Sequence, residues 1–206
     1  MSPFATRDPG LSPVGQDVGD ADRRTLTSIG GVETSSMARG FAVVDAMLKA
    51  ADVTLLLSRT VCPGKYIALV AGEVAGVNAA VSAGADVAAE SLVDQFVIPN
   101  IHPEIFPAIA GTTQVTELSA LGIVETFSVA SLIEAADAAV KAASVRLIEI
   151  RLAMALGGKA FVTFTGSVAA VTTSASAAAE NAGAKGLLGQ KVVIPKPRPE
   201  LLRELI

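Results

Sequence analysis

An internal repeat constrains the fold of this 206-residue chain more than any other feature. Residues 30–38 (GGVETSSMA) recur as residues 122–130 (GIVETFSVA), at an offset of 92. The same offset relates residues 45–51 (DAMLKAA) to residues 137–143 (DAAVKAA). Dense matches at a fixed spacing indicate two tandem copies of one structural unit.

The offset grows along the chain and so locates an insertion. The Gly64-Lys65 pair corresponds to Gly158-Lys159 at an offset of 94, and residues 97–99 (VIP) correspond to residues 193–195 (VIP) at 96. The second copy therefore has two extra residues in the loop that carries Cys62 in the first copy.

The repeat also divides the chain. We expect a first domain over residues 28–115 and a second over residues 116–206. Residues 1–27 lie before the repeat, carry several Pro and Gly residues and few large apolar ones, and predict a disordered N-terminal arm.

Each copy alternates strand-like and helix-like segments. In the first copy we expect four strands and two helices, in the order strand 29–33, helix 36–50, strands 53–57 and 66–70, helix 74–88 and strand 95–98. This β-α-β-β-α-β order is the ferredoxin-like arrangement, an α+β fold with helices on one face of an antiparallel sheet.

Composition narrows the class of function. The net charge of −4 and the pI near 5.0 argue against nucleic acid as a partner. No secretory signal is visible, and the longest uncharged run, residues 160–179, contains too many Ser, Thr and Gly residues for a membrane span. A mean hydropathy of +0.54 suggests large surfaces that are buried against other copies.

Cys62 is the only cysteine of the chain, so an intrachain disulfide is impossible. Pro63 and Gly64 follow it and favour a tight turn, which predicts a sulfur at a loop tip between two strands. A single thiolate is a poor metal site, and an inert buried thiol is the alternative to a functional one.

The repeated motifs resemble a known family. The Glu-Thr-x-Ser-x-Ala, Asp-Ala-x-x-Lys-Ala-Ala, Gly-Lys and Ile-Pro motifs of both copies are similar to those of bacterial microcompartment shell proteins, in the class with two BMC domains per chain. The resemblance covers residues 28–206, and the segment around Cys62 is most similar to the propanediol-utilisation type of shell trimer.

The resemblance implies a homotrimer that mimics a hexamer and forms a flat pseudo-hexagonal tile with a central pore. Such tiles join other shell hexamers and pentamers in the shell of a microcompartment in the bacterial cytoplasm, and an encapsulated redox enzyme would be a further partner. The protein would be structural and not an enzyme.

The resemblance also implies a cofactor. Three Cys62 thiolates would ligate one [4Fe–4S] cluster per trimer at the pore, for electron transfer or cluster passage across the shell. The pore would be lined by residues of both copies, namely Thr60, Val61, Cys62, Pro63, Gly64, Met154, Gly157 and Gly158.

Two repeated lysines, Lys49 and Lys141, end the first helix of each copy. The resemblance puts them at the tile edge, and a lysine that interacts favourably with the helix dipole is a compatible interpretation. Asn100 and Lys196 stand where the family has an edge arginine, and we expect the only histidine, His102, at the edge or surface as well.

Two alternatives remain open. The first is a trimer with an open pore that conducts small metabolites without a cluster. The second is a soluble enzyme or ligand-binding protein built on ferredoxin-like repeats. The sequence contains no Ser-His-Asp set, histidine cluster or nucleotide-binding loop that would favour the second alternative.

Overall fold

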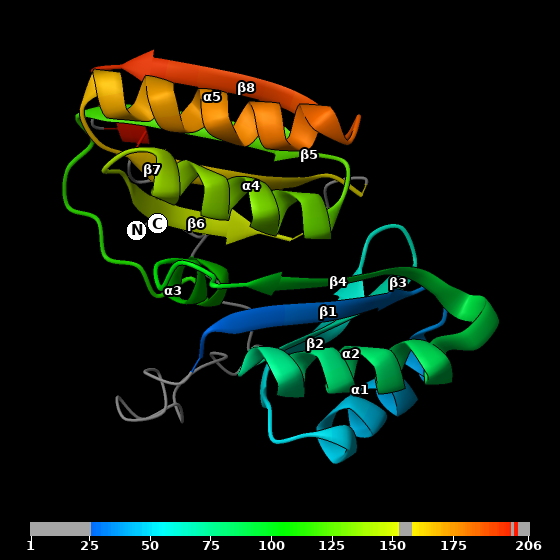
Figure 1. The fold of residues 1–206 in the computed structure, drawn as a ribbon. Helices are drawn as coiled ribbons and strands as arrows, with labels where there is room; N and C mark the ends of the chain where they lie inside the picture. Colours follow the sequence, from blue (N-terminus) through cyan, green and yellow to red (C-terminus); the bar gives the residue numbers. More distant parts are fainter. Residues whose placement is uncertain (1–25, 153–157, 199, 202–206) are drawn as a thin grey trace, which may run out of the picture.

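The computed structural model describes residues 26–152, 158–198, 200 and 201, which form two similar units (Figure 1). The first unit consists of β1 (Ser28–Thr34), α1 (Met37–Ala50), β2 (Thr54–Val61), β3 (Lys65–Gly72), α2 (Val74–Ala88), a 3-10 turn (Ala89–Ser91) and β4 (Leu92–Pro99). After α3 (Ile105–Ala110), the second consists of β5 (Ala120–Thr126), α4 (Val129–Ala142), β6 (Arg146–Arg151), β7 (Ala160–Thr165), α5 (Val168–Ala184) and β8 (Leu188–Pro195).

Each unit is a four-stranded antiparallel sheet with two helices packed on one face. The strand orders are β2-β3-β1-β4 and β6-β7-β5-β8, and all neighbouring strands are antiparallel. The predicted α+β class and the β-α-β-β-α-β order are confirmed. The predicted arm falls almost wholly on residues outside the described ones, but Thr27 already donates its N–H to the carbonyl of Gly72.

Three elements differ from the expectation. β2 continues to Val61 because it stays paired with β3 up to the turn, so Arg59 and Thr60 belong to a strand. β4 starts three residues early, at Leu92, because its pairing with β1 continues across a bulge. The helix α3 was not expected from its sequence, which contains Pro107; a proline is tolerated in the first turn of a helix, and Gly111 ends this one at a φ of 65°.

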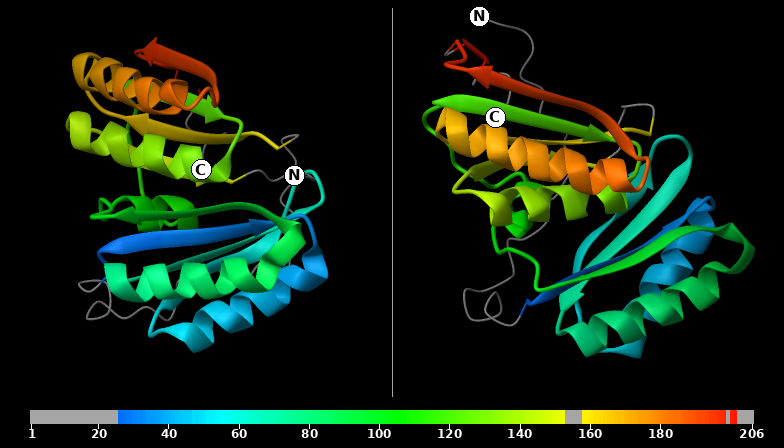
Figure 2. Two further views of the ribbon diagram at one scale, coloured as in Figure 1. Left: turned by 45° about the vertical axis from the view of Figure 1, so that its right-hand side comes forward. Right: turned by 45° about the horizontal axis from the view of Figure 1, so that its top comes forward.

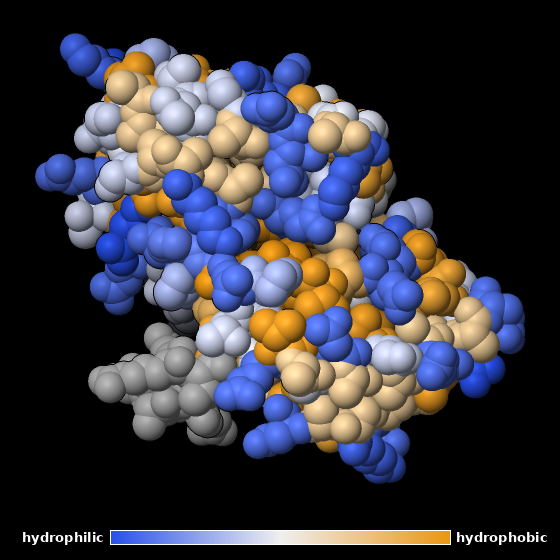
Figure 3. Space-filling model, viewed as in Figure 1, coloured by the Kyte–Doolittle hydropathy of each residue, from blue (hydrophilic) through white to orange (hydrophobic). Residues whose placement is uncertain are grey.

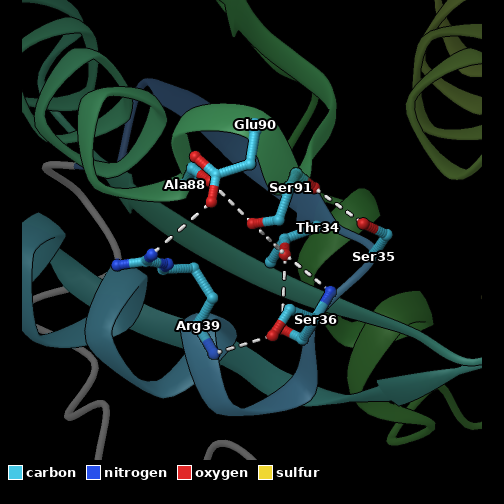
Figure 4. Close-up of polar contacts among 7 residues, drawn as sticks. All are labelled: Thr34, Ser35, Ser36, Arg39, Ala88, Glu90 and Ser91. Atoms are coloured by element: carbon cyan, nitrogen blue, oxygen red, sulfur yellow. Dashed lines mark hydrogen bonds and ion pairs between the residues drawn. The ribbon is translucent and has the colours of Figure 1, made fainter.

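The repeated Glu-Thr-x-Ser motif builds the connection from each first strand to its helix (Figure 4). Ser36 is the N-cap of α1 and accepts a hydrogen bond from the N–H of Arg39. Thr34 donates its hydroxyl to the carbonyl of Ser36 and also bonds the Ser91 hydroxyl at 3.0 Å, which ties β1 to the end of α2. Ser128 caps α4 in the same way, as expected for serine at an N-cap.

The glutamate of that motif has a structural partner in both units. Glu33 is buried and pairs with Lys65, the lysine of the Gly-Lys motif. Glu125 pairs with Lys159 in the second unit, with 3.3 Å between the carboxylate oxygen and the amine. In each unit, the glutamate of the first motif therefore forms an ion pair with the lysine of the Gly-Lys motif.

The first glycine of the repeat allows close packing on the helical side of each sheet. A Cβ on Gly30 would lie 2.5 Å from Cγ1 of Val77 on α2. A Cβ on Gly122 would lie 2.3 Å from Cε2 of the buried Phe164. Both positions need a residue without a side chain.

The largest core cluster joins the two units. It contains Ile29, Ile67 and Ile98 of the first sheet together with Leu132 and Ile133 of α4. In both views of Figure 2, α4 lies on the side of the second unit that faces the first. The first sheet is therefore covered on one face by its own α1 and α2 and on the other by the second unit.

Candidate functional site

Cys62 lies in the turn between β2 and β3, as the sequence predicts. Its thiol is free and half-buried, whereas Pro63 and Gly64 are exposed. Gly64 has a φ of 66°, a conformation that glycine adopts at little cost. Thr60 is exposed and Val61 is buried under the turn.

The equivalent turn of the second unit ends beside this one. A Cβ on Gly158 would lie 3.3 Å from Cδ of Pro63 and 3.7 Å from the carbonyl oxygen of Cys62. The structure thus brings three of the predicted pore residues together. Met154 and Gly157 lie outside the described residues.

Cys62 has no second ligand of its own chain in the described residues. These contain no group of three or more His, Cys, Asp or Glu side chains that could hold a metal ion. A metal centre at Cys62 would therefore need ligands from beyond the described residues of one chain.

Lys141, Asn100 and His102 meet at the junction of the two units. The Lys141 amine donates to the carbonyl oxygen of Asn100 at 2.7 Å and pairs with the carboxylate of Asp137. Asp137 also accepts a hydrogen bond of 2.8 Å from the backbone N–H of His102. These contacts attach the end of the first unit to α4.

Lys49 and Lys196 stand apart from this junction. Lys49 is exposed and pairs with Asp45 at 2.7 Å, one helical turn away. Lys196 is exposed and has a φ of 48°, close to the 52° of its equivalent Asn100. The two equivalent positions therefore share a left-handed φ.

Sequence reasoning missed two acids of the junction. Asp137 lies at the centre of the contacts of Lys141 and His102, and Glu104 accepts a hydrogen bond of 2.9 Å from the N–H of Leu147 on β6. Their recurrence in the two copies could have identified both acids, since Asp137 corresponds to Asp45 and Glu104 to Glu200.

In the described part of the chain, no helix has the length and apolar character that crossing a membrane requires.

Known proteins resemble the chain over both units. The family description "BMC domain" matches residues 28–101 and 120–197. The bacterial microcompartment shell protein PduT of Citrobacter freundii is 44% identical over 179 residues, which are 87% of this chain and 97% of that protein. The shell protein EutM of Salmonella typhimurium is 39% identical over 84 residues, 41% of this chain and 85% of EutM.

Solved structures agree with this likeness. A microcompartment protein from Desulfitobacterium hafniense superimposes with a TM-score of 0.84 at 53% identity, over 86% of this chain and 99% of that one. A fused permuted hexameric shell protein of the RMM microcompartment has a TM-score of 0.55 at 21% identity, covers 76% of this chain and 81% of its own, and shows the fold alone. The chain therefore belongs to the BMC-domain family of microcompartment shell proteins, which are structural and not enzymes, and it carries two such domains in tandem.

Proposed function

We propose that three copies of this chain form a ring-shaped tile of a bacterial microcompartment shell, with the Cys62 turns around its central axis. The tile joins hexameric and pentameric shell proteins in the cytoplasm. The observation that carries the proposal is the unequal burial of α1 and α4, which are equivalent helices in the two units.

α4 is covered by the first unit, but α1 lacks such a cover. Phe41 of α1 is 67% exposed, whereas its equivalent Ile133 is 0% exposed. Met37 is 50% exposed and its equivalent Val129 only 2%. Hydrophobic residues also extend over the helical layer of the first unit in Figure 3. A helix face this apolar is expected to be buried against a partner.

The internal junction suggests which surface covers α1. The first unit contacts α4 through Asn100 and His102, and β6 through Glu104. The second unit has the corresponding positions, which are occupied by Lys196, Arg198 and Glu200. We expect Lys49 of one copy to donate to the Lys196 carbonyl of the next copy. Asp45 would accept from the N–H of Arg198 in the same way.

Such a contact joins different surfaces of successive copies, and a contact of this kind closes into a ring if the rotation allows. Each copy contributes two similar units. A ring of three copies therefore contains six similar units and imitates a hexamer.

A threefold axis would bring three Cys62 thiolates together, and thiolates are the ligands that a [4Fe–4S] cluster needs. The residues fit such a group in two respects. Cys62 is at a partly exposed turn, and Gly158 next to it has no side chain that could block approach. A bound cluster would supply one-electron chemistry, for electron transfer to an enclosed redox enzyme or for cluster passage.

An anaerobic count of iron and sulfide per trimer, with an EPR spectrum, tests the cluster. We expect four irons per trimer in the wild type and none in Cys62→Ser, with the trimer mass unchanged in both. A wild-type trimer that binds no iron after reconstitution would instead support an open pore for small metabolites.

A further inference from the structure

A hollow of about 390 Å³ lies where β2, the end of α3 and β6 meet. Its polar side chains are Arg59, Glu149 and Arg151, and residues 108–111 and Ile150 supply the rest of its wall. Arg59 and Arg151 occupy equivalent positions of the two repeats. None of the turn or edge residues discussed above lines this hollow.

Arg59 has an unusual environment for a positive charge. It lies on β2 between the buried residues Leu57 and Val61, on the face of the sheet that meets the second unit. Its Nε atom is buried and has no hydrogen-bond partner among the described residues, where Arg59 also forms no ion pair. Burial lowers the pKa of its guanidinium from the usual value.

A partly buried guanidinium whose Nε has no partner among the described residues is unfavourable, because buried polar groups are normally hydrogen-bonded and buried charges paired. The other arginine of the hollow has partners. Arg151 pairs with Glu149 at 2.6 Å and stacks over the ring of Phe161 at 5.6 Å. The hollow is therefore left with one positive charge that is not compensated, that of Arg59.

The rest of the wall restricts the shape of a ligand. Ile109 and Ala110, which are only partly buried, offer apolar surface beside the guanidinium. A ligand with two negative charges would meet the carboxylate of Glu149 in the same hollow. One anionic head and a short apolar tail fit these walls best.

We propose that this hollow binds a short aliphatic monocarboxylate, whose two oxygens accept hydrogen bonds from the guanidinium of Arg59 while its alkyl chain contacts Ile109 and Ala110. The site needs no cluster at Cys62 and depends on no other copy of the chain.

Butyrate is the probe, titrated into the full-length assembled protein by calorimetry. We expect saturable binding of one butyrate per chain. Arg59→Gln should weaken it by about tenfold or more, the loss typical of a hydrogen bond to a charged group. The matched control is Arg146→Gln, an exposed arginine on β6 that does not line the hollow, which should stay within about twofold of the wild type.

Two comparisons on the wild type need no variant. Butan-1-ol has a similar chain without the charge and should bind at least about tenfold more weakly than butyrate. Inorganic phosphate should also bind more weakly, because of Glu149. Tighter binding of phosphate, equal binding of the alcohol, or no saturable butyrate binding would each overturn the proposal.

Arg59→Lys is a second variant that keeps the proposal testable if Arg59→Gln does not fold. Lysine keeps the charge but offers no planar pair of donors, so its affinity should lie between those of the wild type and Arg59→Gln. Full wild-type affinity in a folded Arg59→Gln protein would refute the assignment of Arg59.

Discussion

Phe41→Ala gives the sharpest test of the proposed ring. About two-thirds of the Phe41 surface is exposed in one chain, and a phenylalanine offers roughly 200 Å². Burial of about 130 Å² contributes about 3 kcal/mol at about 25 cal/mol per Å², of which alanine would keep about a third. The expected loss is therefore about 2 kcal/mol per interface, or about 30-fold in the affinity of each contact.

A closed ring of three copies has three such interfaces. The free energy of assembly then falls by about 6 kcal/mol, and the protomer concentration at half-dissociation rises on the order of 100-fold. Sedimentation velocity over a dilution series measures this concentration directly. Circular dichroism of the monomeric species should show an unchanged fold, since Phe41 contacts only the ring of Tyr66 among aromatic residues of the described chain, at 5.1 Å between centroids.

The control is Phe127→Ala. Phe127 precedes α4 and is still 54% exposed although α4 is covered by the first unit, so it lies outside the kind of contact that covers this helix. We expect its half-dissociation concentration to remain within about threefold of the wild type. If Phe41→Ala shifted that concentration no more than Phe127→Ala does, the reasoning from the unequal burial of α1 and α4 would be refuted.

Two further predictions use the repeated Asp and Lys pair. Asp137→Asn should lower the midpoint of thermal unfolding by about 3–10 °C, because the buried Asp137 pairs with Lys141 and accepts a hydrogen bond from the N–H of His102. Asp45 is exposed, so Asp45→Asn should change this midpoint by no more than about 2 °C. Equal shifts in the two variants would contradict the assigned contacts. Lys49→Ala should disrupt extended sheets in electron micrographs, because the proposed tile has this lysine at its edge, and should weaken the ring only slightly, since the lost contact with the Lys196 carbonyl of the next copy costs at most about 1 kcal/mol per interface. Normal sheets would remove Lys49 from the tile edge.

The sequence predicted the order of elements well because the signals were local. Hydrophobic periodicity predicted the helix at 74–88 with the bounds that the structure has. Ser36 caps α1, a role for which serine is favoured. The helix α3 was missed because a segment of six residues with an internal proline carries little periodic signal.

The candidate site was predictable in part for the same reason. The Cys-Pro-Gly sequence is enough to predict a turn between strands, and Cys62 lies in one. The partial burial of Arg59 was not predictable, since a lone arginine in a strand normally points to solvent. Arg59 is partly buried because β6 and α3, far along the chain, meet β2 beside it.

The sequence by itself determined the two repeated units, the elements within each and the family that they share. Only the tertiary structure decided which of the two equivalent helices is covered. The motifs at residues 45–51 and 137–143 encode the same amphipathic face, because periodicity records only that a face is apolar. What covers that face depends on how one unit lies against another, and here α4 receives the first unit while α1 does not.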